Sequence, residues 1–246
     1  MQSGLLNPAE PKNLQMIELL LTQLCGEAGP EEKLCFSIPS APSGHDSDLI
    51  FHERSVQGIF EKLGYQARSV NEGLAVVYSE LKDANFTGIG MSFGGGMCNI
   101  CVAYLGLPVL TVATSRAGDY IDQCAASVTG ETPTTVRLHK ENGFILDSDA
   151  DGSIDRALSV YYLDVIESAI TGLENAMAES KKLPNFPRPI PVVCAGGTTM
   201  ARNFLPRLKA SMDDADLPIR ISDVYLAKDP LNTTAKGALV GALLNM

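Results

Sequence analysis

Apolar residues along the chain alternate between a helical spacing and short continuous runs. In residues 12–25 they recur every three or four positions, which places them on one helix face, and Gly26 follows at a stop position. Residues 34–38 form a short run ended by a proline, which is typical of a strand. The same criteria predict further helices at 49–63, 74–81, 119–128, 154–182, 201–211 and 233–244, and further strands at 67–70, 87–93, 99–104, 107–113, 190–194 and 219–224.

The order of these segments predicts a layered α/β fold. Strands and helices alternate over most of the chain, which is the pattern of sheets covered by helices. Three strands, at 87–93, 99–104 and 107–113, follow one another with only short turns between them. Such a succession forms an antiparallel meander, so we expect a mixed sheet rather than a purely parallel one.

The longest uncharged stretch, residues 84–115, is long enough to span a bilayer. It contains Pro108 and several glycines, three of them adjacent at 94–96, which would weaken a lipid-exposed helix. We therefore predict buried strands joined by glycine-rich turns and no transmembrane segment. The N-terminus lacks a basic region followed by a long apolar run, so it predicts no secretory signal.

The composition is that of a folded, acidic protein. The 246 residues are 45% hydrophobic and 20% charged, which supports a sizeable core and excludes a disordered chain. A net charge of −10 repels phosphate backbones and anionic membrane surfaces, so we expect no nucleic-acid partner. The six cysteines are spread through apolar surroundings without a disulfide framework, which favours reduced thiols and a cytoplasmic location.

Two glycine clusters are the candidate ligand sites. Gly94, Gly95 and Gly96 separate two predicted strands, and a turn without Cβ atoms lets backbone N–H groups approach an anion. Gly196 and Gly197 lead from a buried strand toward a helix, which places backbone near a helix N-terminus. Each cluster taken alone is equally well explained as an ordinary tight turn.

Taken together and in order, five segments resemble the motifs of the actin-like ATPase superfamily, which includes the bacterial actin MreB and DnaK-type chaperones. Residues 70–76 (VNEGLAV) resemble the first connecting helix, and residues 92–99 (SFGGGMCN) resemble the second phosphate loop. Residues 117–122 (AGDYID) resemble the segment after that loop, residues 194–197 (CAGG) the adenosine loop, and residues 229–238 (DPLNTTAKGA) the closing helix. The matches span roughly residues 34–246.

The resemblance implies an actin-like, ribonuclease-H-like α/β fold with a mixed sheet flanked by helices. Residues 1–82 would be a remnant of the first subdomain, and residues 83–246 the second subdomain with a shortened insert at about 129–152. It also implies ATP and Mg²⁺ as ligands, self-association into filaments and a cytoskeletal or scaffold role in cell shape. The implied nucleotide-binding residues are Ser92, Gly94, Gly95, Gly96, Met97, Cys98, Gly118, Asp119, Lys140, Glu141, Gly196, Gly197 and Thr198.

Glu72 falls where the superfamily places the residue that orients the attacking water, which makes it the candidate catalytic residue. A carboxylate held near the γ-phosphate can act as a general base. A glutamate at the start of a helix is also favoured by the helix dipole alone, which needs no catalytic role.

The chain departs from the superfamily pattern at both phosphate loops. No segment before residue 34 supplies the first loop, an Asp-x-Gly turn. The aspartate of the second loop is Ser92 here, and its Thr-Thr pair is Met97 and Cys98. A hydroxyl carries no charge and cannot hold hydrated Mg²⁺ as a carboxylate would, so the sequence predicts weak ATP binding and weak or absent hydrolysis.

Three other readings stay open. The first is that the chain is a non-catalytic relative that uses the fold for interaction. The second is that it is a phosphotransferase of the same superfamily, such as a small-acid or sugar kinase. The third is that the sequence is a truncated reading of a longer gene. An acidic chain that lacks part of a domain also exposes apolar surface where that part would pack, which predicts self-association.

Two weaker patterns concern metals. Residues 147–155 copy the start of a calcium loop, but Leu158 stands where the bidentate glutamate belongs, and an acidic turn that caps the next helix explains the same residues. Cys98 and Cys101 lie three apart in a predicted strand and so face opposite sides of the sheet. The three histidines show no ligand spacing, and the sequence identifies no dedicated metal ligands.

Overall fold

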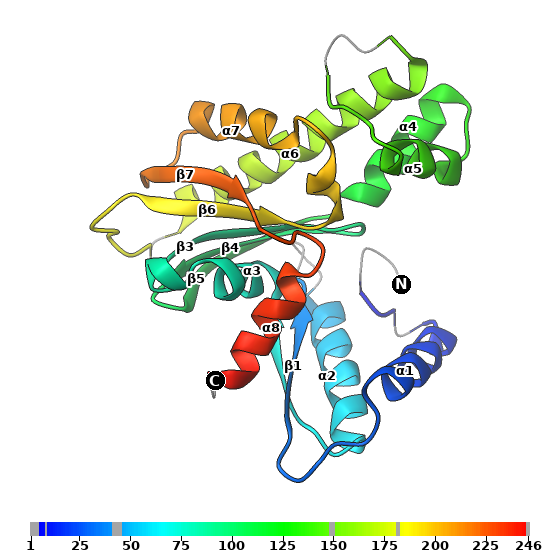
Figure 1. The fold of residues 1–246 in the computed structure, drawn as a ribbon, viewed down its shortest axis with the longest axis vertical. Coiled ribbons are helices and arrows are strands. Elements are labelled where there is room, and N and C mark those ends of the chain that lie inside the picture. Colours follow the sequence, from blue (N-terminus) through cyan, green and yellow to red (C-terminus); the bar gives the residue numbers. More distant parts are fainter. Residues whose placement is uncertain (1–4, 8, 41–45, 148–150, 181–182, 245–246) are drawn as a thin grey trace.

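The computed structural model describes residues 5–7, 9–40, 46–147, 151–180 and 183–244. These residues form a larger unit around a mixed five-stranded sheet and a smaller unit around a two-stranded sheet (Figure 1). The larger unit lies above the smaller one in this view, and helix α8 extends from the larger unit toward the smaller one.

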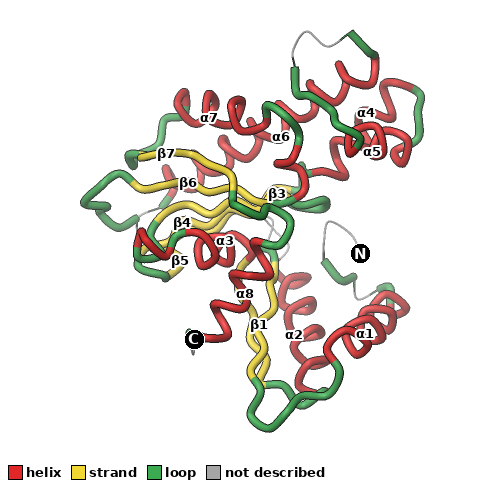
Figure 2. The backbone as a smooth tube through the Cα atoms, viewed as in Figure 1, coloured by secondary structure: helices red, strands yellow, loops and turns green. Residues whose placement is uncertain are grey.

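The five-stranded sheet has the order β5-β4-β3-β6-β7 (Figure 2). Strands β3, β4 and β5 pair antiparallel as a meander, whereas β6 pairs parallel with both β3 and β7. This arrangement confirms the predicted mixed sheet. The strand bounds are Gly88–Phe93 for β3, Cys98–Tyr104 for β4, Leu107–Thr114 for β5, Ile190–Ala195 for β6 and Ile221–Leu226 for β7.

Helices cover both faces of this sheet and enclose two apolar cores. One core contains side chains of α4, α5, α6 and α7, and the other contains side chains of α3 and α8. Cys98 belongs to the first core and Cys101 to the second, which confirms that these cysteines face opposite sides. The helix bounds are Glu72–Glu80 for α3, Gly118–Thr129 for α4, Pro133–Glu141 for α5, Ser153–Glu179 for α6, Phe204–Asp214 for α7 and Thr233–Leu243 for α8.

The smaller unit is a parallel pair of strands with helices on both sides. Strand β1 (Lys33–Ile38) pairs in register with β2 (Gln66–Asn71). Helices α1 (Pro11–Cys25) and α2 (Asp46–Lys62) share an apolar cluster with Phe36 of β1. Helix α8 packs on the opposite face, where it also contacts α3. Helix α8 therefore contacts both units.

The elements differ from the sequence expectation mainly around two turns. Helix α7 begins at Phe204, later than expected, because Gly197–Met200 first form a 3₁₀ turn and Asn203 takes a left-handed backbone with φ of 67°. The short helix α5 has no counterpart among the predicted elements. It begins after Thr132, whose side chain accepts a hydrogen bond from the Thr135 N–H.

Candidate functional site

The two glycine clusters lie side by side at the carboxyl ends of strands β3 and β6 of the five-stranded sheet. Strands β3 and β6 are parallel neighbours, so the turns that follow them emerge together, which is where ligands bind in α/β sheets. The Thr198 hydroxyl donates to the Gly94 carbonyl at 2.9 Å. The start of α4 joins them, because the Gly118 N–H donates to the same carbonyl at 3.0 Å and the Asp119 N–H donates to the Gly95 carbonyl at 2.8 Å.

The two glycines after β6 differ in whether the packing of the protein itself requires them. Gly196 has φ of +100°, and a Cβ there would lie 2.2 Å from the Phe93 carbonyl oxygen. Gly196 is therefore required by the close approach of two strand ends. At Gly197, by contrast, a Cβ would meet nothing closer than the Leu231 side chain at 3.7 Å, so this backbone borders open space.

A cavity of about 470 Å³ opens against these turns. This volume lies within the ~300–1,000 Å³ range of small-molecule sites. The turns and the start of α4 form one wall, and α5 forms another. The lining residues are Gly94, Gly95, Gly118, Asp119, Asp122, Arg137, Lys140, Glu141, Gly143, Phe144, Tyr162, Gly197, Thr198, Met200, Ala201, Arg202 and Leu231.

A buried ion pair lies at the base of this cavity. Lys140 Nζ is 2.6 Å from Asp122 Oδ1, and their side chains are only 11% and 7% exposed. The pair is close, but its direction leaves Oδ1 without a well-aligned hydrogen bond. Burial raises the pKa of the Asp122 carboxyl, and the neighbouring Lys140 opposes that rise. Lys140 also donates to the Gly118 carbonyl at 3.3 Å, which ties α5 to the start of α4.

Glu72 lies outside this cavity, in a polar cluster between the two sheets. Its Oε2 accepts hydrogen bonds from Asn99 Nδ2 at 2.8 Å and from the Ser92 hydroxyl at 3.4 Å. Asn99 Oδ1 in turn accepts from the Ser40 N–H at 2.7 Å, which connects the cluster to the end of β1. Burial raises the pKa of the Glu72 carboxyl, although the two hydrogen bonds oppose the rise.

The structure brings together eight of the residues that the sequence predicted for nucleotide binding. Gly94, Gly95, Gly118, Asp119, Lys140, Glu141, Gly197 and Thr198 all line the cavity. The others lie apart from it. Ser92 is buried and bonded to Glu72, Met97 and Cys98 are buried, and Gly96 and Gly196 do not line the cavity.

Several cavity residues were not predicted from the sequence. Asp122 stands inside residues 117–122, a segment that carried the resemblance, so the pattern contained a signal for it, and Arg137 lies on the same helix as the predicted Lys140 and Glu141. Arg202 reaches the cavity from the turn before α7, where its Nη2 donates to the Gly143 carbonyl at 2.9 Å. No sequence feature marked Arg202, because the turn that carries it had been predicted as helix.

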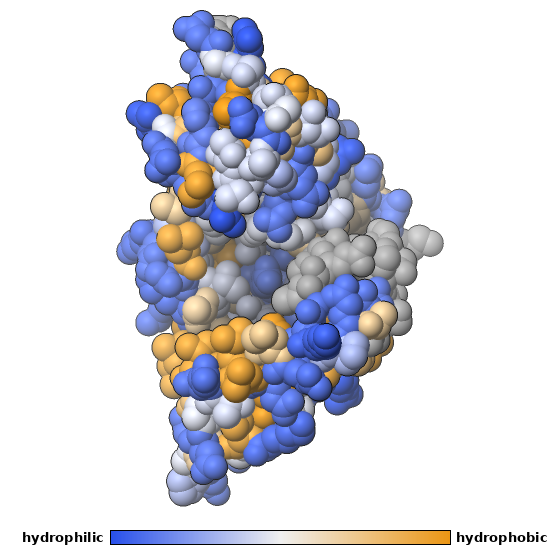
Figure 3. Space-filling view, turned by 90° about the vertical axis from the view of Figure 1, so that its right-hand side faces the viewer, coloured by the Kyte–Doolittle hydropathy of each residue, from blue (hydrophilic) through white to orange (hydrophobic). Residues whose placement is uncertain are grey.

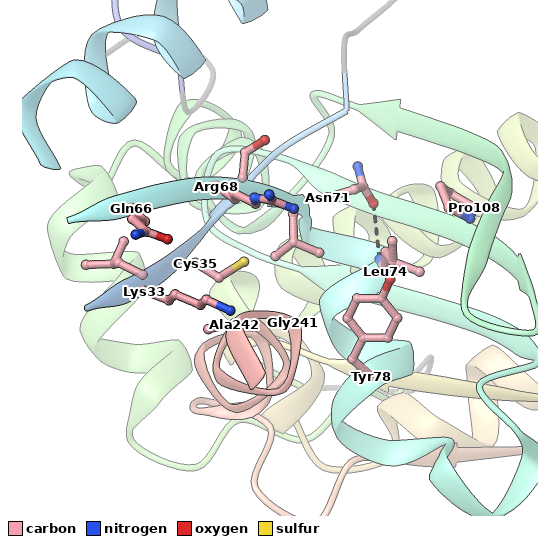
Figure 4. A pocket seen from close by; sticks show the side chains of 13 residues that line it. Lys33, Cys35, Gln66, Arg68, Asn71, Leu74, Tyr78, Pro108, Gly241 and Ala242 are labelled. Carbon is pink, nitrogen blue, oxygen red and sulfur yellow. Dashed lines mark hydrogen bonds between the residues drawn. The ribbon is translucent and has the colours of Figure 1, made fainter. Parts of the chain in front are cut away.

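A second cavity, of about 310 Å³, lies between the two-stranded sheet and helices α3 and α8 (Figure 4). Its lining is largely apolar and includes Leu34, Leu74 and Tyr78. The Cys35 side chain points toward α8, and burial raises the pKa of its thiol, which disfavours the reactive thiolate. This cavity contains none of the residues that the sequence predicted for nucleotide binding or catalysis.

The structure bears only partly on the expected metal and membrane features. Residues 148–150 of the calcium-like segment lie outside the described residues. Within the described ones, no group of three or more His, Cys, Asp or Glu side chains is placed to hold a metal ion. His139 Nε2 instead lies 2.7 Å from Asp155 Oδ1. In the same part of the chain, no helix is long and apolar enough to cross a membrane.

Comparison with known proteins gives one family match and several related folds. The Volactin family matches residues 1–242, and no curated protein matches the chain. A MamK double helical filament is 18% identical with a TM-score of 0.74, and the match covers 99% of this chain and 79% of MamK. The crystal structure of MreB 5 of Spiroplasma citri bound to AMPPNP is 13% identical with a TM-score of 0.70, and the match covers 100% of this chain and 78% of MreB 5.

A third relative is the ethanolamine utilization protein EutJ from Carboxydothermus hydrogenoformans. It is 18% identical with a TM-score of 0.58, and the match covers 94% of this chain and 74% of EutJ. At these identities the likeness establishes the fold. The chain has the actin-like fold, which confirms the expectation drawn from the five sequence motifs.

Proposed function

The chain belongs to the Volactin family, and on that premise we propose that it is an actin-like, nucleotide-binding cytoskeletal or scaffold protein that self-associates in the cytoplasm. The observation that carries the proposal is the convergence of the β3 turn, the β6 turn and the start of α4 on one 470 Å³ cavity. A MamK filament and AMPPNP-bound MreB 5 share the fold, which supports filament formation and nucleotide binding here.

The cavity suits a nucleoside phosphate such as ATP. Gly95 and Gly197 present backbone without side chains, and Arg137 and Arg202 supply positive charge for phosphate groups. Leu231 and Met200 supply apolar surface for a base. The fit for Mg²⁺ is poorer, because Ser92 replaces the expected aspartate and its hydroxyl already bonds to Glu72. Asp119 is the carboxylate nearest the glycine turn and would hold the ion through the bound phosphates.

We propose that hydrolysis is weak or absent. Glu72 is held by Asn99 and Ser92 and does not line the cavity, so it is not placed to orient a water at a phosphate bound there. The arrangement favours a bound nucleotide that acts as a structural ligand.

No observation favours the alternative of a phosphotransferase. Such an enzyme needs an acceptor site that opens onto the phosphate end of the nucleotide. The 310 Å³ cavity shares no lining residue with the 470 Å³ cavity, so it does not provide such a site.

Calorimetric titration with ATP and ADP, with and without Mg²⁺, tests the nucleotide proposal. We expect weak binding that Gly95→Val abolishes, because a Cβ at Gly95 already lies 3.1 Å from the Asp119 carboxylate and a larger side chain fills the turn. Gly58→Val is the matched control, since Gly58 on α2 has nothing within 4 Å of an added Cβ. Wild-type protein without affinity at millimolar nucleotide would refute the proposal.

A further inference from the structure

The cavity of about 310 Å³ exists because α8 covers mainly one strand of the two-stranded sheet. Helix α8 packs chiefly on β1, where a Cβ at Gly241 would lie 3.2 Å from Cys35 Sγ. Arg68 of β2, which is in register with Cys35, lines the space beside α8. Helix α3 begins directly after β2 and contributes Leu74 and Tyr78 to another wall (Figure 4). The cavity therefore lies between the smaller unit and α3 of the larger one.

The interior of this cavity is apolar and shielded from water. Val70 and Leu74 are buried residues of the lining, and Pro108 of β5 also lines it. Burial raises the pKa of the Tyr78 hydroxyl to about 12, and it also raises the pKa of the Cys35 thiol, as expected for groups with little access to solvent. Such surroundings favour an apolar ligand group over water.

Arg68 places an uncompensated positive charge beside this apolar space. It is exposed, and it forms no ion pair with any residue that the structure describes. The described residues of the lining include no aspartate or glutamate, although the whole chain has 29 acidic and only 19 basic residues. Lys33 adds positive charge to the same lining. Figure 4 shows Arg68 in the middle of the labelled side chains, between Cys35 and Asn71. A guanidinium in this position is complementary to a carboxylate.

The volume of the cavity limits the ligand to a small molecule. A water molecule occupies about 30 Å³, and a methylene group is of similar size, so 310 Å³ holds about ten such groups. An unbranched acid of about eight carbon atoms has that many non-hydrogen atoms. The two acyl chains of a membrane lipid exceed this space.

We propose that this cavity binds a small amphipathic carboxylic acid, whose apolar chain lies between β2 and α3 and whose carboxylate pairs with Arg68. Burial of the chain supplies most of the affinity, and the charge pair orients the ligand with its carboxylate toward solvent. The ligand contacts residues of both units and so stabilises their junction. The site is separate from the proposed nucleotide site, because the two cavities share no lining residue.

Calorimetric titration of the full-length chain with unbranched acids, from butanoate to dodecanoate, tests the proposal. We expect octanoate to bind with a dissociation constant of about 1 mM or below. Each added methylene should strengthen binding up to about fourfold, because it buries more apolar surface. The gain should stop at about eight to ten carbon atoms, where the cavity is full. An affinity that rises steadily to dodecanoate would contradict a site of this size.

Alkylation of Cys35 by a small maleimide locates the ligand independently of its affinity. Cys35 lines the cavity, whereas Cys25 is exposed and lies outside the lining, so Cys25 is an internal control. At ten times its dissociation constant, octanoate should slow the labelling of Cys35 about tenfold, because only the free protein reacts. Peptide mass spectrometry should show Cys25 labelled at an unchanged rate.

Two matched pairs of variants separate the charge from the apolar space. Arg68→Gln should weaken octanoate about fivefold and leave octanol, which has no charge, unchanged. Arg54→Gln removes the same charge from an exposed position of α2 outside the lining and should change neither. Ala242→Phe fills the cavity and should abolish binding of both ligands. Ala235→Phe adds the same ring at an exposed position of α8 outside the lining and should bind like wild type.

Three results would overturn the proposal. The first is no octanoate binding at about 10 mM. The second is binding that leaves the labelling of Cys35 unchanged. The third is an equal loss of octanoate and octanol affinity in Arg68→Gln, which would mean that no charge pair forms. Arg68 is exposed, so its variant stays informative even if Ala242→Phe does not fold. Nucleotide titration is independent of all three, so failure here is distinguishable from failure of the proposed function.

Discussion

Glu72 and Lys140 are charged side chains that the fold removes from water in different ways. Glu72 is compensated by two neutral hydrogen-bond donors, Asn99 and Ser92. Lys140 is compensated by a full opposite charge on Asp122. Two neutral donors stabilise a carboxylate less than an ion pair does, so the two sites respond differently to pH and to substitution.

Glu72 should make the protein less stable as pH rises. The carboxyl has an ordinary pKa of 4.5 when unfolded and a higher one when folded, so the folded state binds more protons between those values. The free energy of unfolding of the wild type, relative to Glu72→Gln, should therefore fall as pH rises through that window. Denaturant titrations of both proteins from pH 4 upward measure this difference, and a constant difference would contradict it.

Lys140→Met should be strongly destabilising. It leaves the Asp122 carboxylate buried without its partner, and breaking a buried pair in this way costs about 3–5 kcal/mol. Lys236→Met is the matched control, because Lys236 pairs with Asp229 at an exposed position and should cost about 0–1 kcal/mol. Urea unfolding of the two variants gives the comparison, and equal losses would contradict the buried-pair interpretation.

At the scale of elements, the contact between α8 and α3 holds the smaller unit against the larger one. Helix α8 contacts α3 and β1, and α3 packs on strands β3 and β4. The contact depends on a very close approach of two backbones. A Cβ at Gly237 of α8 would lie 1.7 Å from the Ala75 carbonyl oxygen of α3. The two helices touch without an intervening side chain at that point.

Gly237→Ala should therefore separate α8 from α3. The added methyl meets backbone that cannot rotate away, so we expect a loss of at least about 3 kcal/mol, at the upper end of overpacking effects. Gly58→Ala on α2 is the matched substitution, because it has open space and should stabilise by about 0.5–1 kcal/mol. Thermal or urea unfolding distinguishes them, and a neutral Gly237→Ala would show that the helices do not approach so closely.

At the scale of the whole molecule, the 470 Å³ cavity and the Glu72 cluster are separate places in one fold. The cavity lies between the ends of β3 and β6 and helix α5, whereas Glu72 sits at the junction with the smaller unit. Phosphoryl transfer requires the nucleotide, the metal and the positioned water to meet in one arrangement. The described residues place the two glycine turns and the start of α4 around the 470 Å³ cavity. Glu72, the candidate for positioning the water, lies outside that cavity.

We therefore expect ATP turnover near the uncatalysed background. Losing one electrostatic contact of a catalytic site costs about 10²–10³ in rate, and Ser92 stands where the resemblance places the second-loop aspartate. Glu72→Ala should change the rate little, and Ser92→Asp should strengthen Mg²⁺-dependent binding without restoring full activity. Phosphate release assays with and without Mg²⁺ test this. A robust Mg²⁺-dependent rate that Glu72→Ala eliminates would show an ordinary ATPase.

The sequence by itself determined the mixed sheet, its three-stranded meander and the two glycine turns. These follow from residue spacing and turn chemistry, which act between near neighbours, and in the structure Gly94, Gly95 and Gly197 line the 470 Å³ cavity. Only the tertiary structure decided the remaining walls. Arg202 enters the cavity because a 3₁₀ turn delays α7, and Glu72 is drawn to Asn99, which lies 27 residues further along the chain.

The same distinction applies to the surface of the smaller unit. The helical spacing of residues 12–25 predicted one apolar face on α1. How much of that face is buried depends on which elements of the fold pack against α1, and no local pattern in the α1 sequence specifies them. Figure 3 shows an apolar patch on the lower part of the molecule. The structure leaves Met16, Leu20 and Leu24 exposed because, among the described elements, α1 packs mainly on α2, which covers only one side of it.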